Sequence, residues 1–464
     1  EVDDLATQRV LDRSLADLDL LVETGPKPGQ HLIAAGLPWF AALFGRDSLL
    51  SAYEAIAFRP ALAVDALTVL ADRQAGPSDP HGGEPGQILH ELRTGEMART
   101  GEVPFGPSFG SVDATPLFLV LLGESIDWLD DPVLLERLWP AALRALAWID
   151  ARMGGDPLGF LRYVGRPGAL ANEGWKDSPD SVRGHDGAIV PPPIALAEVQ
   201  GYVYDAWRRM ARLARQRNEP RFAASLDRRA ARLRTRFAQV FWQPDRGFAP
   251  MAIGRDGARA NALASNIGQC LALGILEERH AELVAGRMLL RDMDSGWGIR
   301  TLAASEPAFD PLGYHTGSVW PHDTALIAGG LKRAGFDDGA TRLADELLEA
   351  AAALPAGRLP ELISGAVRSP GRPPDLVPGA CLIQAWASAA PLHLVRILLG
   401  FEPQAALGRL GLRRPRLPSA VGKVTIRGLA IGGERLDLEV RRTRRSVRAR
   451  AISGRGAIQL VRLG

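Results

Sequence analysis

Six short clusters of polar and aromatic residues recur along the chain, and each opens an apolar stretch with helical spacing. They are GRDS at 45–48, VDAT at 112–115, EVQGY at 198–202, SNIGQ at 265–269, SVWPHD at 318–323 and IQAW at 383–386. A second, amphipathic stretch separates each cluster from the next. Repetition of one helical pair is typical of toroids whose inner helices converge on a single pocket. The pattern therefore predicts an all-α fold, an (α/α)6 barrel built as a six-hairpin toroid.

The stretches between the clusters carry an apolar stripe on one face and charged residues on the other, as outer helices do. We expect these helices at about 3–22, 60–74, 132–152, 219–240, 276–291 and 338–354. The stretches after the clusters, such as TPLFLVLLGESI, are apolar on nearly every side, so they should line the interior of the ring. Between these helices we expect long loops rich in glycine, proline and tryptophan, at 77–110, 154–193, 292–317 and 356–380. Long loops on a rigid scaffold commonly carry the functional residues.

The helical pattern stops near Gly400. Beyond it, VTIRGL, ERLDLEV, SVRARAI and AIQLVRL alternate apolar and polar residues between glycine-rich turns, which is typical of strands. We therefore predict a catalytic domain over 1–400 and a small β-rich segment over 401–464. The run RRTRRSVRAR could bind nucleic acid, but arginines on the wet face of exposed strands, where charge resists aggregation, are the better interpretation.

Composition excludes several classes of protein. A formal net charge of +2 favours neither nucleic acid nor an anionic membrane as partner. Cys270 and Cys381 lie in apolar helical context, which indicates buried thiols rather than a disulfide. No apolar run reaches the roughly 18 residues of a membrane span, and no secretory leader opens the chain. A cytoplasmic enzyme is expected, although a chain that begins at Glu1 rather than at methionine leaves room for an upstream segment.

Two carboxylates outside the clusters indicate a chemistry. Inverting hydrolysis of a glycosidic bond needs a protonated carboxyl for the leaving oxygen and an ionised one to activate water, about 6.5–9.5 Å apart. Asp177 in NEGWKDS follows Trp175, whose ring would raise the pKa of the carboxyl, and Lys176, whose charge would lower it. Glu361 in RLPELISG lies in the loop before the last inner helix. Taken singly, each is more typical of a turn or an exposed loop charge.

Several long strings resemble one family. They are FGRDSLL, SVDATPLF, NEGWKDS, EVQGYVYDA, SNIGQCLALGI, SGWGIRTL, YHTGSVWPHDTALIAGGL, LPELISG and CLIQAWASAAPL. In collinear order over about residues 5–400 they resemble the catalytic domain of bacterial amylo-alpha-1,6-glucosidases, the glycogen-debranching relatives of family 63 α-glucosidases and trehalases. The resemblance implies an (α/α)6 barrel and an inverting exo-acting glycosidase without a cofactor, with Asp177 as general acid and Glu361 as general base.

A sugar in a closed subsite calls for carboxylates and amides at its edges and for indole rings against its faces. Arg46 and Asp47 resemble the family's sugar clamp. The further candidates for substrate binding are Glu91, Arg93, Asp113, Trp175, Lys176, Gln200, Trp297, Trp320, His322, Asp323, Gln384 and Trp386. Core packing for each tryptophan, and helix N-caps for Asp47 and Asp113, are the competing interpretations. His315 and His322 lack the spacing and the cysteine partners of a zinc site, so no metal is expected.

The chain departs from the family's pattern in three places. No segment corresponds to the upstream β-sandwich domain of bacterial relatives, Thr316 stands where relatives often have asparagine, and the loop 365–380 is rich in proline and arginine. The expected substrate is the α-1,6-linked glucosyl stub of a glycogen-like α-glucan. One alternative is a small α-glucoside, trehalose-like or glucosylglycerate-like. A sugar epimerase or lyase on the same toroid, and a carbohydrate-binding protein without activity, are the others.

Overall fold

The computed structural model describes residues 1–464 except 26, 103–105, 166–169, 445, 454–457 and 464. Within that part, six helices contact one another in succession, and the last contacts the first, so they close a ring. Each begins within or directly beside one of the six polar clusters. They are α2 (Gly45–Ala55), α5 (Ala114–Leu129), α7 (Ala197–Gln216), α9 (Asn266–Leu273), α11 (Pro321–Arg333) and α13 (Ala385–Leu399).

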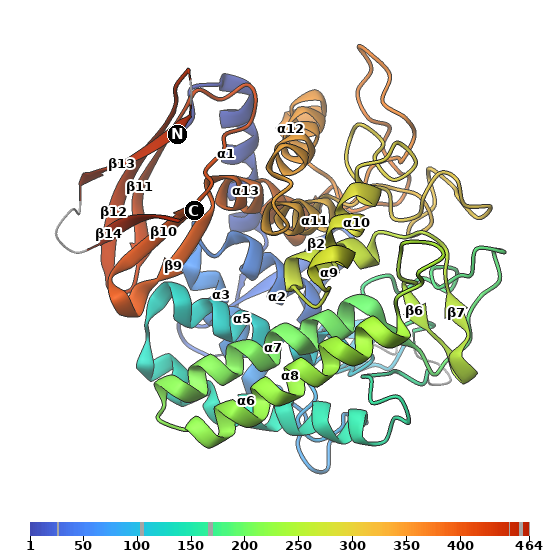
Figure 1. Ribbon diagram of the computed structural model, residues 1–464. Helices are drawn as coiled ribbons and strands as arrows, with labels where there is room; N and C mark the ends of the chain where they lie inside the picture. Colours follow the sequence, from blue (N-terminus) through green and yellow to red (C-terminus); the bar gives the residue numbers. More distant parts are fainter. Residues whose placement is uncertain (26, 103–105, 166–169, 445, 454–457, 464) are drawn as a thin grey trace.

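A second set of helices covers the outside of the ring. Of these, α8 (Pro220–Val240) contacts α7 and α6 (Pro132–Gly154) contacts α5, and Figure 1 shows α7 and α8 side by side. Aspartate caps and proline at the first turn start several of them: the Asp131 side chain accepts a hydrogen bond from the Leu134 amide at 2.9 Å, and Pro132 follows it. Their polar faces meet water and their apolar stripes meet the inner helices. They are α1 (Leu5–Leu20), α3 (Pro60–Asp72), α6 (Pro132–Gly154), α8 (Pro220–Val240), α10 (Glu278–Met288) and α12 (Asp337–Ala353).

The all-α assignment is wrong, because the chain is 44% helix and 18% strand. One sheet joins the loops at the N-terminal ends of the inner helices: β1 (Val22–Thr24), β2 (His31–Leu37), β3 (Phe40–Phe44), β4 (Glu91–Leu92) and β8 (Ile383–Gln384). A second joins β5 (Ala195–Leu196), β6 (Ala252–Ile253) and β7 (Arg259–Ala260). Buried loop backbone must hydrogen bond to something, and here the loops pair with one another.

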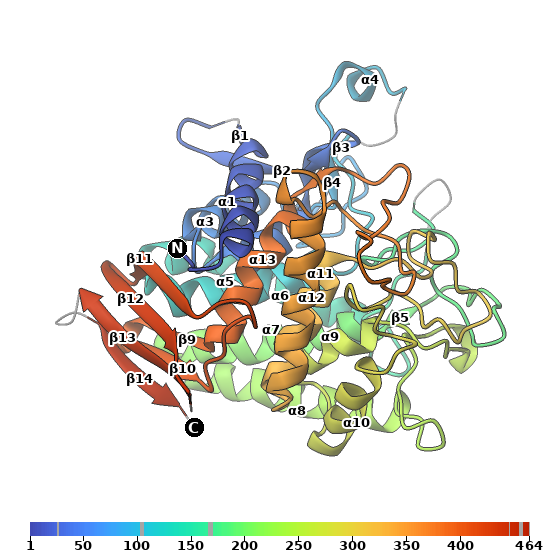
Figure 2. The same cartoon turned by 90° about the horizontal axis from the view of Figure 1, so that it is seen from above.

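The strands after Gly400 form two sheets on one flank of the ring, in red and orange in Figure 2. β9 (Phe401–Gln404), β10 (Arg409–Arg413) and β14 (Gln459–Leu463) form the first, and β11 (Lys423–Ile431), β12 (Glu434–Arg442) and β13 (Val447–Ser453) the second. The Glu1 ammonium donates to the Thr425 carbonyl at 2.8 Å, so the start of the chain joins the second sheet. A domain boundary at residue 400 stays a proposal.

The structure also tests two expectations about the cysteines and about membrane-spanning segments. Cys270 and Cys381 are buried free thiols, which confirms the expectation from their apolar context. Within the described ranges, no helix combines the length and the apolar character needed to cross a membrane.

Glu54 on α2 is fully buried, and neither of its carboxyl oxygens has a hydrogen-bond partner among the described residues. Burial raises its pKa well above the ordinary value, so the folded chain holds a proton that the unfolded chain releases. Stability should therefore fall as pH rises above the ordinary glutamate pKa. We expect Glu54→Gln to raise the free energy of unfolding by about 1–3 kcal/mol at pH 8 and to be nearly neutral at pH 4. Urea unfolding at both pH values measures this; an equal effect at both would contradict it.

Candidate active site

A cavity of about 260 Å³ opens at the N-terminal ends of the inner helices. The sheet formed by β2, β3, β4 and β8 supplies one wall, and the loops before α7, α11 and α13 supply the others. Both Asp177 and Glu361 line this one cavity. Among the described residues, the lining consists of Phe40, Phe44, Arg46, Asp47, His90, Glu91, Arg93, Leu170, Trp175, Asp177, Tyr314, His315, Trp320, Glu361, Gln384 and Trp386.

Asp177 is held in place by an arginine from the first inner helix. Arg46 donates from Nη2 to Asp177 Oδ2 at 3.2 Å and from Nη1 to Asp113 Oδ2 at 2.8 Å. The side chain of Asp177 keeps 30% exposure, whereas that of Arg46 keeps 4%. Burial raises the pKa of Asp177 to about 6, the Arg46 charge opposes that rise, and Asp113 adds to it. A carboxyl with these properties can carry a proton near neutral pH and release it to a ligand.

Glu361 is almost completely buried at 1% exposure and is held by two donors. The Tyr314 hydroxyl donates to Oε1, and the Cys381 amide donates to Oε2 at 2.9 Å. Burial raises the pKa of Glu361 to about 7, both hydrogen bonds oppose the rise, and the negative charge of Asp177 adds to it. The two donors leave the carboxylate fixed in orientation with its charge partly compensated, which suits a base that accepts a proton from water.

Asp47 is a third carboxyl group in the cavity lining, beside Asp177 and Glu361. Gln384 donates to Asp47 Oδ1 at 3.3 Å, which joins the first residues of α2 to the last strand before α13. Burial raises the pKa of Asp47 to about 7, with Arg46 lowering it and Asp177 and Glu361 raising it. Neither Asp47 nor Asp113 caps its helix through its side chain. The Asp47 carboxylate therefore lines the cavity, whereas that of Asp113 is buried behind it and pairs with Arg46.

Aromatic rings form the remaining walls. Trp175 meets Trp320 edge to face with ring centroids 5.6 Å apart, and Trp320 meets Trp386 in the same way at 5.8 Å. Behind them His322 stacks on Trp386 at 4.1 Å. The indole nitrogens of Trp175 and Trp386 are buried and have no partner among the described residues. Indole faces beside unpaired N–H donors match the apolar faces and hydroxyl edges of a sugar.

The predicted binding residues divide into three groups by position. Those that line the cavity are Arg46, Asp47, Glu91, Arg93, Trp175, Trp320, Gln384 and Trp386. A second group, Asp113, Lys176, His322 and Asp323, is buried outside the lining. Lys176, for example, donates to the Thr301 carbonyl at 2.7 Å, and burial lowers its pKa to about 8. These four contribute charge and packing behind the wall.

Gln200 and Trp297 lie outside the cavity. Gln200 donates to the carbonyls of Leu161 and Leu196 and accepts from the Leu161 amide, so its side-chain amide is used by the backbone. Trp297 lies under the guanidinium of Arg368, 4.2 Å from the ring centroid. Both were predicted as site residues because polar and aromatic residues are typical of sugar-binding sites. Whether such a residue lines the cavity depends on the direction of its side chain, which the sequence alone does not give.

Sequence reasoning gave no role to Tyr314, and no signal except its place in YHTGSVWPHD could have indicated one. The same holds for His90, in HELRTGE, and for Phe40 and Phe44 on β3. His315 also lines the cavity: its Nδ1 lies 2.8 Å from Ser178 Oγ, and its ring stacks on Trp320. Among the described residues, no group of three or more His, Cys, Asp or Glu side chains could hold a metal ion.

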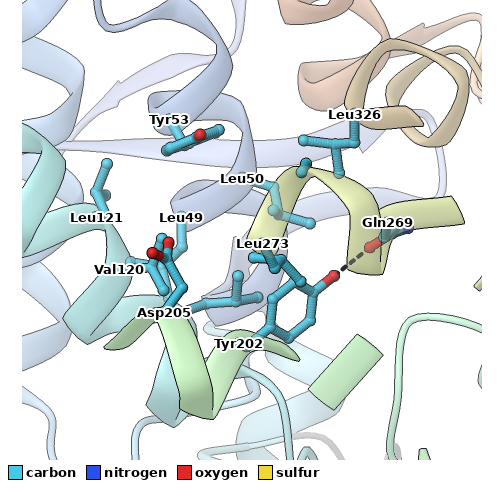
Figure 3. Close-up of a pocket in the computed structure, with 12 residues that line it drawn as sticks. Leu49, Leu50, Tyr53, Val120, Leu121, Tyr202, Asp205, Gln269, Leu273 and Leu326 are labelled. Carbon is cyan, nitrogen blue, oxygen red and sulfur yellow. Dashed lines mark hydrogen bonds between the residues drawn. The ribbon is translucent and has the colours of Figure 1, made fainter. Parts of the chain in front are cut away.

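The interior of the ring below the cavity is filled by side chains. Figure 3 shows Leu49, Leu50 and Tyr53 of α2 facing Tyr202 of α7 and Leu326 of α11 around a pocket of about 30 Å³. Such a volume holds only one or two water molecules. Among the described residues, these side chains separate the active-site cavity from the opposite end of the ring.

Comparisons with known proteins add the following. A family model described as the mannosylglycerate hydrolase MGH1-like glycoside hydrolase domain matches residues 44–359. No curated protein sequence matches the chain. The GH78 family rhamnosidase of a Bacillus species superposes with a TM-score of 0.68 and 13% identity, over 100% of this chain and 42% of the rhamnosidase. The GH63 mannosylglycerate hydrolase from Thermus thermophilus, in complex with Tris, superposes with a TM-score of 0.63 and 15% identity, over 83% of this chain and 99% of the hydrolase.

These structural matches establish a likeness of fold with six-hairpin glycosidases. The chain spans less than half the length of the Bacillus rhamnosidase. Neither the family model nor these two structures points to amylo-alpha-1,6-glucosidase in particular, so they do not support the narrower part of the sequence resemblance, glycogen debranching.

Proposed function

The chain belongs to the MGH1-like glycoside hydrolase family, and from that premise we propose that it hydrolyses a small α-glycoside with inversion of the anomeric centre. The aglycone we propose is a short polar acid such as glycerate, as the family description and the name of the Thermus thermophilus hydrolase indicate. This is the alternative of a glucosylglycerate-like substrate rather than a glucan branch. The observation that carries the proposal is one cavity of about 260 Å³ that is lined by both Asp177 and Glu361.

In the proposed reaction, protonated Asp177 gives its proton to the glycosidic oxygen as the bond to the anomeric carbon breaks. Ionised Glu361 accepts a proton from a water molecule whose oxygen bonds to the anomeric carbon from the opposite face. The sugar leaves with inverted configuration and the aglycone leaves as an alcohol. Asp177 is then ionised and Glu361 protonated, and exchange with solvent restores both.

The neighbouring residues support this division of roles. Arg46 holds Asp177 toward the cavity and stabilises the carboxylate that proton donation creates. Asp47 and Gln384 are placed to accept from and donate to sugar hydroxyls, and Trp175 and Trp386 to pack against the ring. Arg93, partly exposed and paired with Glu91, is the cation of the lining that is placed to meet an acidic aglycone.

A substrate panel followed by proton NMR tests the proposal. We expect turnover of α-mannosylglycerate or α-glucosylglycerate, no release of glucose from a phosphorylase limit dextrin, and the β-anomer of the sugar as the first product. Turnover of the dextrin with none of the small glycosides would overturn the proposed substrate class. The α-anomer as first product would overturn the mechanism.

The pH dependence of kcat/KM follows from the two carboxyl groups. Activity needs Asp177 protonated, which is lost as pH rises through its pKa of about 6, and Glu361 ionised, which is lost as pH falls through its pKa of about 7. We expect a bell-shaped profile with its maximum between pH 6 and 7. Initial rates over pH 4 to about 9 at constant ionic strength measure it. A maximum near pH 4, where ordinary carboxyl groups titrate, would contradict the raised pKa values of Asp177 and Glu361.

Tyr314→Phe removes one of the two donors to Glu361 and leaves the aromatic ring in place. Because this hydrogen bond lowers the pKa of Glu361, its loss should raise that pKa and move the pH optimum upward. We expect kcat to fall about 10-fold with little change in KM, since one hydrogen bond to a charged group contributes about 1.5–3 kcal/mol. Tyr53→Phe, on the same scaffold but outside the cavity, is the matched control. An unchanged pH optimum in the first variant would mean that Tyr314 does not set the ionisation of Glu361.

A further inference from the structure

A second cavity lies at the opposite end of the helical ring from the candidate active site. The active-site cavity is lined by Arg46 and Trp386, near the N-terminal ends of α2 and α13. The second, of about 470 Å³, is lined by Tyr53, Lys332 and Arg396, near the C-terminal ends of α2, α11 and α13. Strands β9 and β10 close its side, and Figure 2 shows these strands away from the loops that carry β4 and β5.

The lining of this cavity is strongly cationic. Five basic residues line it: Lys332, Arg333, Arg396, Arg413 and Arg414. One carboxylate, Glu402, lines the cavity and pairs with Arg413. Outside the lining, Asp337 pairs with Lys332 and Arg414, and Glu124 pairs with Arg396. Five positive charges therefore meet three negative ones among the described residues, and the cavity keeps an excess of positive charge.

Backbone carbonyl groups near the C-terminal ends of the helices compensate part of this positive charge. Arg396 donates to the Tyr53 carbonyl at 2.9 Å, and Arg414 donates to the Lys332 carbonyl at 2.6 Å. Arg333 is different: its one hydrogen bond to the described residues is to the Ala272 carbonyl at 3.4 Å, and it pairs with no carboxylate among them. Arg333 is exposed, so most of the five donors of its guanidinium face solvent and can meet a ligand there.

The guanidinium of Arg333 packs closely against the end of α9. Gly274 there has a φ of +72°, and a Cβ at this position would lie only 2.4 Å from Nη2 of Arg333, so a side chain would displace the guanidinium. His393, at 3% exposure, lines the cavity with an Nδ1 that has no partner among the described residues. Burial and the charge of Arg396 lower the pKa of His393 to about 3, so its ring is neutral and can donate one hydrogen bond.

We propose that this second cavity binds a phosphate-type oxyanion, either inorganic phosphate or the phosphoryl group of a small phosphomonoester. Arg333 supplies a planar fork that matches two oxygens of such a group, and Lys332 and Arg413 supply further positive charge. The side chains of Arg413 and Arg414 keep 41% and 35% exposure, so the cavity is reachable from solvent. Its volume exceeds that of phosphate alone and accommodates a short organic substituent.

Calorimetric titration of the full chain with inorganic phosphate tests the proposal, with sodium chloride holding ionic strength constant. We expect saturable binding at one site. Arg333→Gln should raise Kd at least 10-fold, because it removes the guanidinium without a carboxylate partner. Arg228→Gln, which changes an exposed arginine of α8 that lines neither cavity, should bind as the unmodified chain does. A parallel titration with glycerol phosphate distinguishes the sources, since tighter binding than phosphate identifies a phosphomonoester.

Arg413→Gln provides a second variant on the partly exposed strand β10, and thermal unfolding of each variant without phosphate checks its folding. The proposal is overturned if the unmodified chain gives no saturable heat up to millimolar phosphate. It is equally overturned if chloride replaces phosphate without loss, or if both cavity variants bind phosphate as tightly as Arg228→Gln.

Discussion

Asp177→Asn is expected to lower kcat by about 10²- to 10⁴-fold on a natural glycoside, with KM changed by less than about 3-fold. The amide keeps the size of the carboxyl and can still contact Arg46, but it has no proton of suitable pKa for the leaving oxygen. Sugar binding depends on other residues of the cavity and should persist. Steady-state kinetics of the variant, with isothermal titration of the free sugar, measure both quantities.

A substrate with a better leaving group tests the role of Asp177 more sharply. A glycosyl fluoride needs little assistance by an acid, so the loss for Asp177→Asn should shrink strongly on that substrate. Asp180→Asn is the matched control, because Asp180 lies in the same loop with its side chain 48% exposed and does not line the cavity. Full activity of Asp177→Asn on the natural glycoside would exclude this residue as the acid and remove the basis of the proposed mechanism.

Glu361→Gln is expected to lower kcat by a similar factor, about 10²- to 10⁴-fold, on every substrate regardless of leaving group. Water activation is needed whatever departs from the anomeric carbon, so a glycosyl fluoride should offer no relief. The glutamine carbonyl can still accept from the Cys381 amide, and its NH2 group can donate to the Tyr314 hydroxyl, which then accepts instead of donating. Rates on both substrates, measured beside those of Asp177→Asn, separate the two roles.

Azide provides an independent check of the base. It is a nucleophile that needs no deprotonation, so it should restore turnover of the fluoride by Glu361→Gln and give a glycosyl azide of inverted configuration. Glu349→Gln, a change on the outer helix α12 at a side chain 54% exposed, is the control for loss of one charge. Equal loss for both leaving groups in both cavity variants, with no effect of azide, would mean that the acid and base roles are not divided as proposed.

Helix positions were accessible from sequence because each inner helix carries its own signal. The polar clusters GRDS and SVWPHD lie directly at the start of α2 and α11, and the apolar surface that follows identifies a buried helix. Short strands carried no such signal. HLIAAGLPWFAALF forms β2 and β3, but both are too short and too uniformly apolar to show alternation, which is why the all-α prediction failed.

Candidate site residues were predicted from their residue type, and the tertiary structure separated those that line the cavity from those that do not. Gln384 and Gln200 lie at equivalent clusters, yet Gln384 bonds Asp47 in the cavity, whereas Gln200 bonds the Leu161 backbone. The difference depends on which loop packs beside each helix, and a single sequence does not contain that information. Tyr314 was missed for the same reason, since its partner Glu361 is distant along the chain.

The roles proposed for Asp177 and Glu361 came from a resemblance of motifs, because each carboxyl taken singly is more typical of a turn or a loop charge. Local patterns were sufficient for the helices of the ring and for the strands at the end of the chain. These depend on short-range periodicity and on chemistry that each residue carries with it. Only the folded chain decided that Asp177 and Glu361 share one cavity and that burial moves their pKa values to about 6 and 7. Cavity walls, ion pairs and desolvation arise from contacts between distant segments, because the ring brings its six hairpin ends together only when it closes.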